Sequence, residues 1–216
     1  AIADVVRRTL LTYWNTVSFQ SLYARTAEWS PSVEAPATEE RPLIDQWVLS
    51  EAARVARDVD HALENFDTQR GGRILAEYID DLSNWYVRRS RRRFWDGDES
   101  ALATLHEALR IVTLCLAPYT PFIAERVWQD LFRATDDQAP ISVHLASWPS
   151  LENAAINDDL RDNMALVRRV VELGRAARAT SSVKTRQPLS RALVSAPGWA
   201  QLPDELVAEV ADELNV

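Results

Sequence analysis

Residues 102–116 read Leu-Ala-Thr-Leu-His-Glu-Ala-Leu-Arg-Ile-Val-Thr-Leu-Cys-Leu, a run with clear helical periodicity. Its large apolar residues follow one another at alternating spacings of three and four. They are Leu102, Leu105, Leu109, Val112 and Leu116. This spacing places all five on one face of an α-helix. The run therefore predicts the buried seam of a helical bundle.

Helical periodicity continues on both sides of this run. Long helices are predicted over residues 4–26, 43–65, 67–95 and 156–179, and a shorter one begins at Thr120-Pro121. The chain is 47% hydrophobic, which can support a sizeable core, and it holds only five glycines, which disfavours a turn-rich all-β fold. The expected fold class is mainly α, an antiparallel α-helical bundle.

Short polar residues and glycines predict where these helices begin and end. Asp67 and Asp98 are suitable N-caps, and Gly97 suits the left-handed position that follows a helix. Gly71-Gly72 lies near the start of a helix, where each glycine costs about 1 kcal/mol relative to alanine. We expect a close packing contact or a local bend there.

The sequence changes character towards its C-terminus. Residues 133–150 are predicted as a loop that contains an extended stretch over 141–148. Residues 188–195 are predicted as a short strand and residues 203–214 as a helix. Because a strand and a helix cannot bury a face of their own, they are expected to open a small α/β domain. The predicted division is residues 1–182 for the bundle and residues 183–216 for the start of that domain.

Residues 84–95 read Asn-Trp-Tyr-Val-Arg-Arg-Ser-Arg-Arg-Arg-Phe-Trp, with five arginines in six positions. The whole chain carries a net charge of −8 and has a pI of about 5.0. A basic block on an acidic protein forms a local patch that can bind phosphates, with aromatic rings nearby to stack on bases. A plainer interpretation is that cations are favoured near a helix C-terminus and face solvent.

Helical phase separates this block into two faces, at about 100° per residue. One face is a ridge that could contact RNA: Asn84, Arg88, Arg91 and Trp95. The other continues the apolar stripe of the helix and includes Arg89 and Arg93, which could lie over the bundle or pair with buried acids. Trp85 continues the same stripe and is expected in the core.

Catalytic and metal-binding patterns do not stand out. The three histidines are scattered, and Cys115 is the only cysteine, which excludes internal disulfides and cysteine-based zinc sites and favours a reduced, cytosolic setting. No glycine-rich phosphate loop occurs, and no apolar run reaches the roughly 20 residues that span a bilayer. We expect no catalytic residue, no metal and no cofactor in this chain.

Four segments together resemble a known family. Residues 82–95 closely resemble a helix of the anticodon-binding domain of isoleucyl-tRNA synthetases. Residues 116–125 (Leu-Ala-Pro-Tyr-Thr-Pro-Phe-Ile-Ala-Glu) and 143–149 (Val-His-Leu-Ala-Ser-Trp-Pro) resemble segments shared with the valyl and leucyl relatives. Residues 184–189 (Lys-Thr-Arg-Gln-Pro-Leu) are similar to the junction after the bundle in the isoleucyl and valyl enzymes.

This resemblance implies a domain that packs on the anticodon stem and loop of an isoleucine tRNA. The parent ligase would be cytoplasmic and would use ATP and Mg²⁺ in a catalytic domain of the same polypeptide, without contact with a membrane. The two ATP-binding signatures of that catalytic domain do not occur in this sequence, so the chain alone is expected to be inactive. The residues expected to bind tRNA are Asn84, Arg88, Arg91, Arg92, Trp95, Lys184 and Arg186.

Two alternatives remain open from the sequence. The valyl enzyme has a Trp-Tyr pair in the corresponding helix but lacks this run of arginines. A helical protein-interaction scaffold with an incidental basic patch would have the same periodicity. The salt dependence of tRNA binding separates an RNA-binding domain from a scaffold, because only phosphate contacts release counterions.

Overall fold

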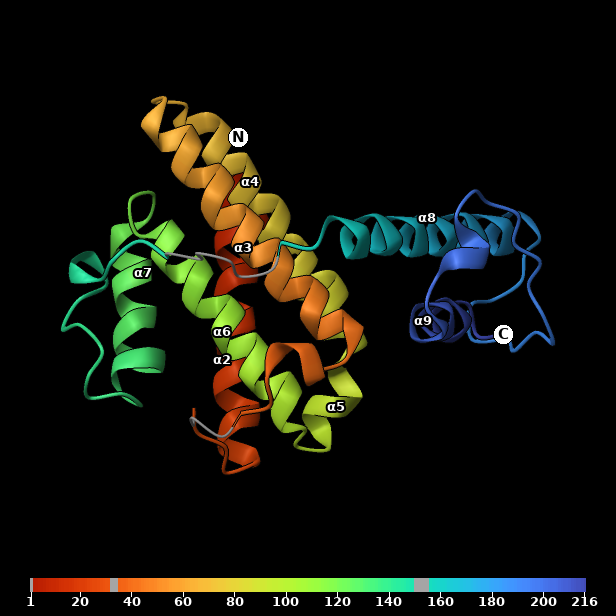
Figure 1. Ribbon diagram of the computed structural model, residues 1–216, viewed down its shortest axis with the longest axis horizontal. Helices are drawn as coiled ribbons and strands as arrows, with labels where there is room; N and C mark the ends of the chain where they lie inside the picture. The colour runs from red at the N-terminus through yellow and green to blue at the C-terminus, as the bar shows by residue number, and fades with distance from the viewer. Residues whose placement is uncertain (1, 32–34, 150–155) are drawn as a thin grey trace. The chain divides into compact units, whose positions relative to one another are not determined.

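A computed structural model describes residues 2–31, 35–149 and 156–216 (Figure 1). Within these ranges the chain forms helices, turns and irregular segments, and no β-strand. The predicted mainly α fold is confirmed. The chain divides into two compact units, Ala1–Ile156 (unit 1) and Asn157–Val216 (unit 2). None of the helices in the described ranges combines the length and the hydropathy needed to cross a bilayer.

Unit 1 is built from the following helices in chain order: α1 (Ile2–Val5), η1 (Val6–Leu10), α2 (Leu11–Thr26), η2 (Thr38–Glu40), α3 (Leu43–Glu64), α4 (Thr68–Asp80), η3 (Asp81–Val87), α5 (Arg91–Trp95), α6 (Glu99–Leu116), α7 (Pro121–Val127), η4 (Trp128–Arg133) and η5 (Val143–Leu145). The elements η1, η3 and η4 are π-helical turns, and η2 and η5 are short 3₁₀ turns.

Helix α6 forms the centre of unit 1. Its five predicted seam residues are all at most 3% exposed, and it packs against α2, α3 and α4. Tyr13 of α2 crosses to α6, where its Oη lies 2.6 Å from Oγ1 of Thr113. Figure 1 shows α3 and α4 side by side, joined by a short turn. The predicted bundle seam is confirmed.

The three residues predicted to cap or terminate helices are also confirmed. Asp67 caps α4, because its Oδ1 accepts a hydrogen bond of 3.0 Å from the amide of Arg70. Asp98 caps α6 in the same way, with a bond of 2.9 Å from the amide of Ala101. Gly97 adopts a φ of +73°, the left-handed conformation that terminates α5.

The predicted helix over residues 67–95 is interrupted. It begins as α4, widens into the π-helical segment η3, and turns at Ser90 before α5 continues to Trp95. Ser90 has φ −82° and ψ 5°, and its amide bonds to the carbonyl of Tyr86 at 2.9 Å. The arginine block therefore lies across a break between two helical segments, which helical phase alone does not reveal.

Gly71 makes the close contact that the sequence predicts. A methyl group at this position would overlap the hydroxyl of Tyr119 and would lie 3.6 Å from Cβ of Ala62 on α3. A methyl group at Gly72 would meet only Cε1 of Tyr119, at an ordinary 3.8 Å. The first glycine thus permits α4 to approach the turn after α6, whereas the second does not have this role.

Gly71→Ala should therefore lower the free energy of unfolding by about 1–3 kcal/mol, the usual cost of overpacking. Gly72→Ala is the matched control and should stabilise the protein by about 1 kcal/mol through helix propensity. Tyr119→Phe removes a buried hydroxyl that has no hydrogen-bond partner among the described residues, so it should be nearly neutral and should relieve most of the Gly71→Ala defect. Urea denaturation of the four variants checks this, and equal effects of the two alanines would contradict it.

The segment after α7 and η4 differs from its prediction. The expected extended stretch over residues 141–148 contains the 3₁₀ turn η5. Glu125 of α7 holds this turn: its Oε2 accepts bonds from the Ser142 hydroxyl at 2.8 Å and from the Val143 amide at 3.0 Å. The carboxylate of Glu125 thus accepts hydrogen bonds that, in a sheet, would go to a neighbouring strand.

Unit 2 consists of α8 (Asp158–Thr180), the 3₁₀ turn η6 (Trp199–Gln201) and α9 (Asp204–Leu214). The predicted C-terminal helix is confirmed, but the predicted strand at residues 188–195 is wrong. The Leu189 amide donates to the carbonyl of Asn215 at 3.1 Å, and the amides of residues 190–195 make no backbone hydrogen bond within the described ranges. An isolated extended segment has no partner with which to form a ladder.

The division of the chain also differs from the predicted domains 1–182 and 183–216. Helix α8 groups with the C-terminal residues in unit 2, because it packs along α9. The approach is close at Gly174, where a methyl group would overlap the side chain of Leu214. The loop that follows α8 and carries Lys184 and Arg186 is therefore part of the same unit as α8.

Candidate nucleic-acid interface

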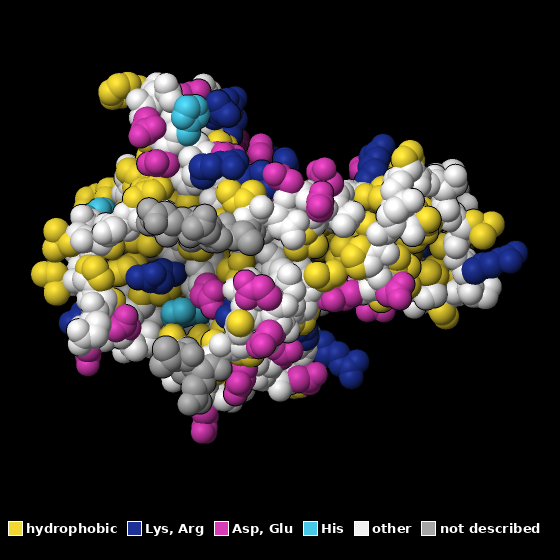
Figure 2. Space-filling model, viewed as in Figure 1, with side chains coloured by type: hydrophobic (Ala, Val, Ile, Leu, Met, Phe, Trp, Pro, Cys, Tyr) yellow, Lys and Arg dark blue, Asp and Glu magenta, His cyan; other side chains and the backbone are white. Residues whose placement is uncertain are grey.

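Five of the predicted RNA-binding residues form an exposed surface on unit 1, here called the basic ridge: Asn84, Arg88, Arg91, Arg92 and Trp95. The side chain of Arg92 is 94% exposed and Trp95 is 78% exposed. On the face of the molecule drawn in Figure 2, acidic and basic side chains are interspersed. Because the chain as a whole has a net charge of −8, the three exposed arginines of the basic ridge are a local concentration of positive charge.

Local contacts orient the first half of the basic ridge. The side-chain amide of Asn84 donates to Oδ1 of Asp80 at 2.6 Å, and Nε of Arg88 donates to the main-chain carbonyl of Asn84 at 2.9 Å. The guanidinium carbon of Arg88 lies 5.6 Å from the ring centroid of Trp85. Trp85 is only 8% exposed, in agreement with its predicted place in the core, so it supports Arg88 from beneath.

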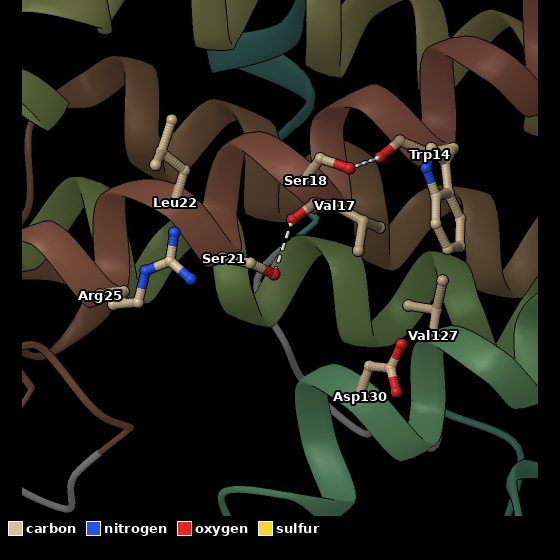
Figure 3. Close-up of a pocket in the computed structure, with 8 residues that line it drawn as sticks. All are labelled: Trp14, Val17, Ser18, Ser21, Leu22, Arg25, Val127 and Asp130. Carbon is tan, nitrogen blue, oxygen red and sulfur yellow. Dashed lines mark hydrogen bonds between the residues drawn. The ribbon is translucent and has the colours of Figure 1, made fainter.

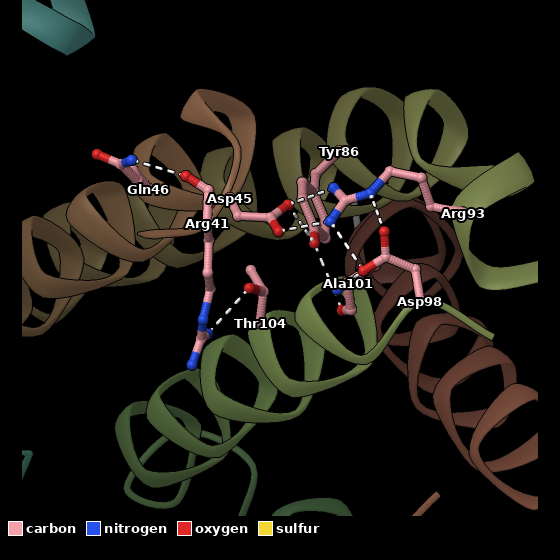
Figure 4. A network of polar contacts seen from close by, with 8 residues as sticks. All are labelled: Arg41, Asp45, Gln46, Tyr86, Arg93, Asp98, Ala101 and Thr104. Carbon is pink, nitrogen blue, oxygen red and sulfur yellow. Dashed lines mark hydrogen bonds and ion pairs between the residues drawn. The ribbon is translucent and has the colours of Figure 1, made fainter. Parts of the chain in front are cut away.

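The second half of the basic ridge lies on α5, the helix that also carries Arg93. Figure 4 shows the contacts of the Arg93 guanidinium. This guanidinium donates to both carboxylate oxygens of Asp45 on α3, at 2.7 and 2.8 Å. It also donates to both oxygens of Asp98, at 2.9 and 3.2 Å. We call these three residues the arginine clamp. Arg93 therefore pairs with a buried acid, one of the two outcomes that its place on the apolar stripe allowed, and fixes α5 to the bundle.

The arginine clamp is a low-dielectric site. Asp45 is fully buried, and the side chain of Arg93 is 23% exposed. Burial by itself lowers the pKa of Arg93, but the bonds and charges of its two carboxylate partners raise it above the ordinary value. Burial of Asp98 opposes ionisation, yet its bonds to Arg93 and to the Ala101 amide leave its pKa lowered. Arg93 and Asp98 are therefore both charged at neutral pH.

Tyr86 extends the arginine clamp into the core. It is 0% exposed, and its hydroxyl donates to Oδ1 of Asp45 at 2.9 Å. Burial, together with the adjacent Asp45 charge, raises the pKa of this phenol well above its usual range. The tyrosine therefore remains a neutral donor that satisfies a buried carboxylate, and its ring packs edge-on against Phe94 of α5.

The other two predicted RNA-binding residues, Lys184 and Arg186, lie in unit 2. Both are exposed, in the loop that follows α8. The structure thus groups the seven predicted residues into two surfaces, five on unit 1 and two on unit 2. The sequence did not single out Asp45, the buried acid that holds α5 in place, because its partner Arg93 lies 48 positions away in the chain.

A shallow groove runs between α2 and the α7–η4 segment (Figure 3). Trp14 and Val127 line its apolar part, and Arg25 and Asp130 lie at its polar edge. The serine hydroxyls in the groove already donate to main-chain carbonyls of their own helix. No pair of acid and base, and no nucleophile with an adjacent base, is brought together by the residues that line it.

The remaining titratable groups have structural surroundings. Burial, reinforced by the charge of Arg110, lowers the pKa of His106 to about 4, so this histidine is neutral and packs between Trp29 and Phe132. Burial raises the pKa of the Cys115 thiol beyond its usual range. In the described parts of the chain, no group of three or more His, Cys, Asp or Glu side chains is placed to hold a metal ion.

Comparison with known proteins shows the family of the chain that carries this surface. Residues 45–193 match the model of the anticodon-binding domain of tRNA ligases. The chain belongs to this family. The match begins at Asp45 and includes all five residues of the basic ridge, the arginine clamp and the loop with Lys184 and Arg186. The family prediction made from residues 82–95 is confirmed.

Individual relatives of this anticodon-binding domain are isoleucine–tRNA ligases. The chain is 60% identical to that of Streptomyces avermitilis, 58% to that of Streptomyces coelicolor and 42% to that of Thermus thermophilus. Each match covers 100% of this chain and 20 or 21% of the relative. The chain thus spans about a fifth of the length of the curated relatives it matches.

Proposed function

We propose that the basic ridge binds the anticodon stem and loop of a tRNA. The observation that carries this proposal is the exposed arginine surface, anchored by the ion pair of Arg93 with the fully buried Asp45, within a domain of the anticodon-binding family. Guanidinium groups make charge-assisted bonds to phosphate oxygens. Trp95, exposed beside them, offers an aromatic face on which an unpaired base can stack.

The tRNA we propose is one specific for isoleucine. Support comes from relatives at up to 60% identity over the full chain, which are isoleucine–tRNA ligases, and from the arginine run of residues 88–93. The valyl alternative is less well supported, because the resemblance of residues 82–95 is to the isoleucyl enzymes.

The whole protein, on this proposal, is a cytoplasmic ligase that joins isoleucine to its tRNA. Its catalytic domain, elsewhere in the same polypeptide, would bind ATP and Mg²⁺, and this domain would position the tRNA for it. The two ATP-binding signatures of such a catalytic domain do not occur in this sequence. ATP–pyrophosphate exchange with isoleucine should therefore remain at background for the isolated chain, and exchange activity that copurifies with it through stringent separation would contradict the assignment.

Filter binding over a range of salt concentrations tests the proposed tRNA contact. The affinity for an isoleucine tRNA transcript should fall linearly on a log–log plot, with a slope of several units, because each neutralised phosphate releases condensed counterions. A valine tRNA should bind more weakly at equal salt. If a folded sample shows no tRNA binding at low salt, the chain is instead a protein-interaction scaffold.

A further inference from the structure

Unit 2 contains a long stretch without negative charge. Residues 173–203 hold five basic residues and no aspartate or glutamate, in a chain with a net charge of −8. The five are Arg175, Arg178, Lys184, Arg186 and Arg191, and Lys184 is the only lysine of the protein. The acids of unit 2 precede and follow this stretch, on α8 as far as Glu172 and on α9 from Asp204. The loop that joins the two helices therefore carries basic side chains and no acidic ones.

Arg178 is the buried member of this group. It is 6% exposed, and its guanidinium donates to four main-chain carbonyls. Nη1 bonds to Lys184 at 3.0 Å and to Gln187 at 2.9 Å, and Nη2 bonds to Leu214 at 2.5 Å and to Asn215 at 3.2 Å. The first two carbonyls belong to the loop, and the last two to the end of α9.

Arg178 therefore does more than neutralise the carboxyl end of one helix. A cation near a helix C-terminus is favoured by the dipole, but two of its four bonds go to a loop of irregular backbone. The planar guanidinium carries five donors in a fixed geometry. It can fix the loop and the end of α9 at the same time, which a flexible ammonium group cannot do.

Further bonds complete the support of this loop. The side-chain amide of Asn215 donates to the carbonyl of Arg186 at 3.0 Å, and the amide of Leu189 donates to the carbonyl of Asn215 at 3.1 Å. Just after the end of α8, Ser182 adopts a left-handed φ of +56°. The Val183 amide then donates to the carbonyl of Arg178 at 2.9 Å. The backbone of the loop is thus fixed from both sides.

The side chains of the loop are left facing solvent. Lys184, Thr185 and Arg186 are all exposed, and so is Arg191 a few residues later. Their backbone is held by inward hydrogen bonds, so the cations lie on the outer surface of a preorganised loop. Because the loop is already ordered, less conformational entropy is lost when a ligand binds to it.

We propose that residues 184–191 form a second phosphate-binding surface for the tRNA backbone and that Arg178 is its positioning residue. This inference rests on the proposed function and adds to it a contact made by unit 2. Exposed lysine, arginine and threonine side chains are typical donors to phosphate oxygens. Residues 184–191 include no aromatic side chain, so the surface should contact the sugar–phosphate backbone and carry little base specificity.

The experiment is a salt titration of tRNA binding by the full 216-residue chain and three variants. Lys184→Gln/Arg186→Gln removes the two exposed cations. Arg178→Lys keeps the charge but loses the planar fork. Arg175→Lys is the matched control, because Arg175 also links α8 to α9, through an ion pair with Glu213, but makes no hydrogen bond to the loop among the residues that the structure describes.

Lys184→Gln/Arg186→Gln should reduce the salt slope by roughly two, one for each lost phosphate contact. Arg178→Lys should reduce the slope by a similar amount although no charge is lost, whereas Arg175→Lys should leave it unchanged. A role of Arg178 in stability alone would lower the melting temperature without changing the slope of the folded protein. Helical circular dichroism at the titration temperature confirms that each variant is folded.

The outcomes separate the two proposals. If the chain binds tRNA and Lys184→Gln/Arg186→Gln leaves both affinity and slope unchanged, the second surface does not exist while the proposed function stands. If that double variant loses slope but Arg178→Lys does not, Arg178 is not the positioning residue. If the unchanged chain does not bind tRNA at low salt, both proposals are overturned.

Discussion

Replacing Arg93 with methionine should lower the free energy of unfolding by about 3–5 kcal/mol, the usual result of breaking a buried ion pair. Methionine retains most of the apolar stem, so the principal loss is the guanidinium. The variant leaves Asp45, which is fully buried, without its cationic partner, and the neutral hydroxyl of Tyr86 still donates to it. A buried carboxylate without a cationic partner is costly unless it is neutralised or hydrated.

Arg91→Met is the matched control for this variant. It makes the same substitution two residues earlier on the same helix, where the side chain is exposed and no acid within the described ranges pairs with it. Its effect should be within about 0.5 kcal/mol. In thermal melts, Arg93→Met should lower the midpoint by roughly 6–20 °C, and equal midpoints for the two variants would show that the arginine clamp contributes no stability.

A double variant distinguishes an abandoned charge from lost packing. In Asp45→Ala/Arg93→Met no fully buried carboxylate is left unpaired, because the remaining Asp98 is partly exposed and still accepts from the Ala101 amide. Much of the stability lost in Arg93→Met should therefore return. Asp45→Ala alone should cost less than Arg93→Met, because Arg93 keeps Asp98 as a partner and is partly exposed. If the double variant is as unstable as the sum of the single ones, the arginine contributes through packing and not through its charge.

Features that depend on neighbouring residues could be predicted from the sequence. The seam from Leu102 to Leu116 is buried as its spacing predicts. Asp67 and Asp98 cap the helices that they precede, because capping requires only the next three residues. The four residues of the predicted RNA-facing ridge are all exposed, whereas Trp85 is buried and Arg89 and Arg93 are half-buried, even though the helix turns at Ser90.

Features that depend on distant residues could not be predicted. Asp45 and Arg93 are 48 positions apart, and an acid at the start of a helix is usually a solvated first-turn residue. Arg178 resembles an ordinary C-terminal cation until the carbonyls of Leu214 and Asn215 are placed beside it. Residues 188–195 have strand composition, but β propensity has little effect without a neighbouring strand.

Replacing both Arg88 and Arg91 with glutamine should weaken tRNA binding by roughly 100-fold or more. Each charge-assisted bond to a phosphate is worth about 1.5–3 kcal/mol, and every 1.4 kcal/mol is tenfold in affinity. The salt slope should also become shallower by roughly two. Thermal stability should change by no more than about 0.5 kcal/mol for each exposed position, although Arg88 also lies 5.6 Å from the Trp85 ring centroid.

Trp95→Ala is the comparison that shows whether charge carries this effect. Trp95 is 78% exposed, and loss of a stacked base should cost about 1–3 kcal/mol of binding. Because an indole ring neutralises no phosphate, this variant should weaken binding without changing the salt slope. The two arginines should change both quantities. If Arg88→Gln/Arg91→Gln weakens binding at every salt concentration equally, these arginines do not contact phosphates, and if it lowers stability as much as Arg93→Met does, the exposed and buried faces have been assigned the wrong way round.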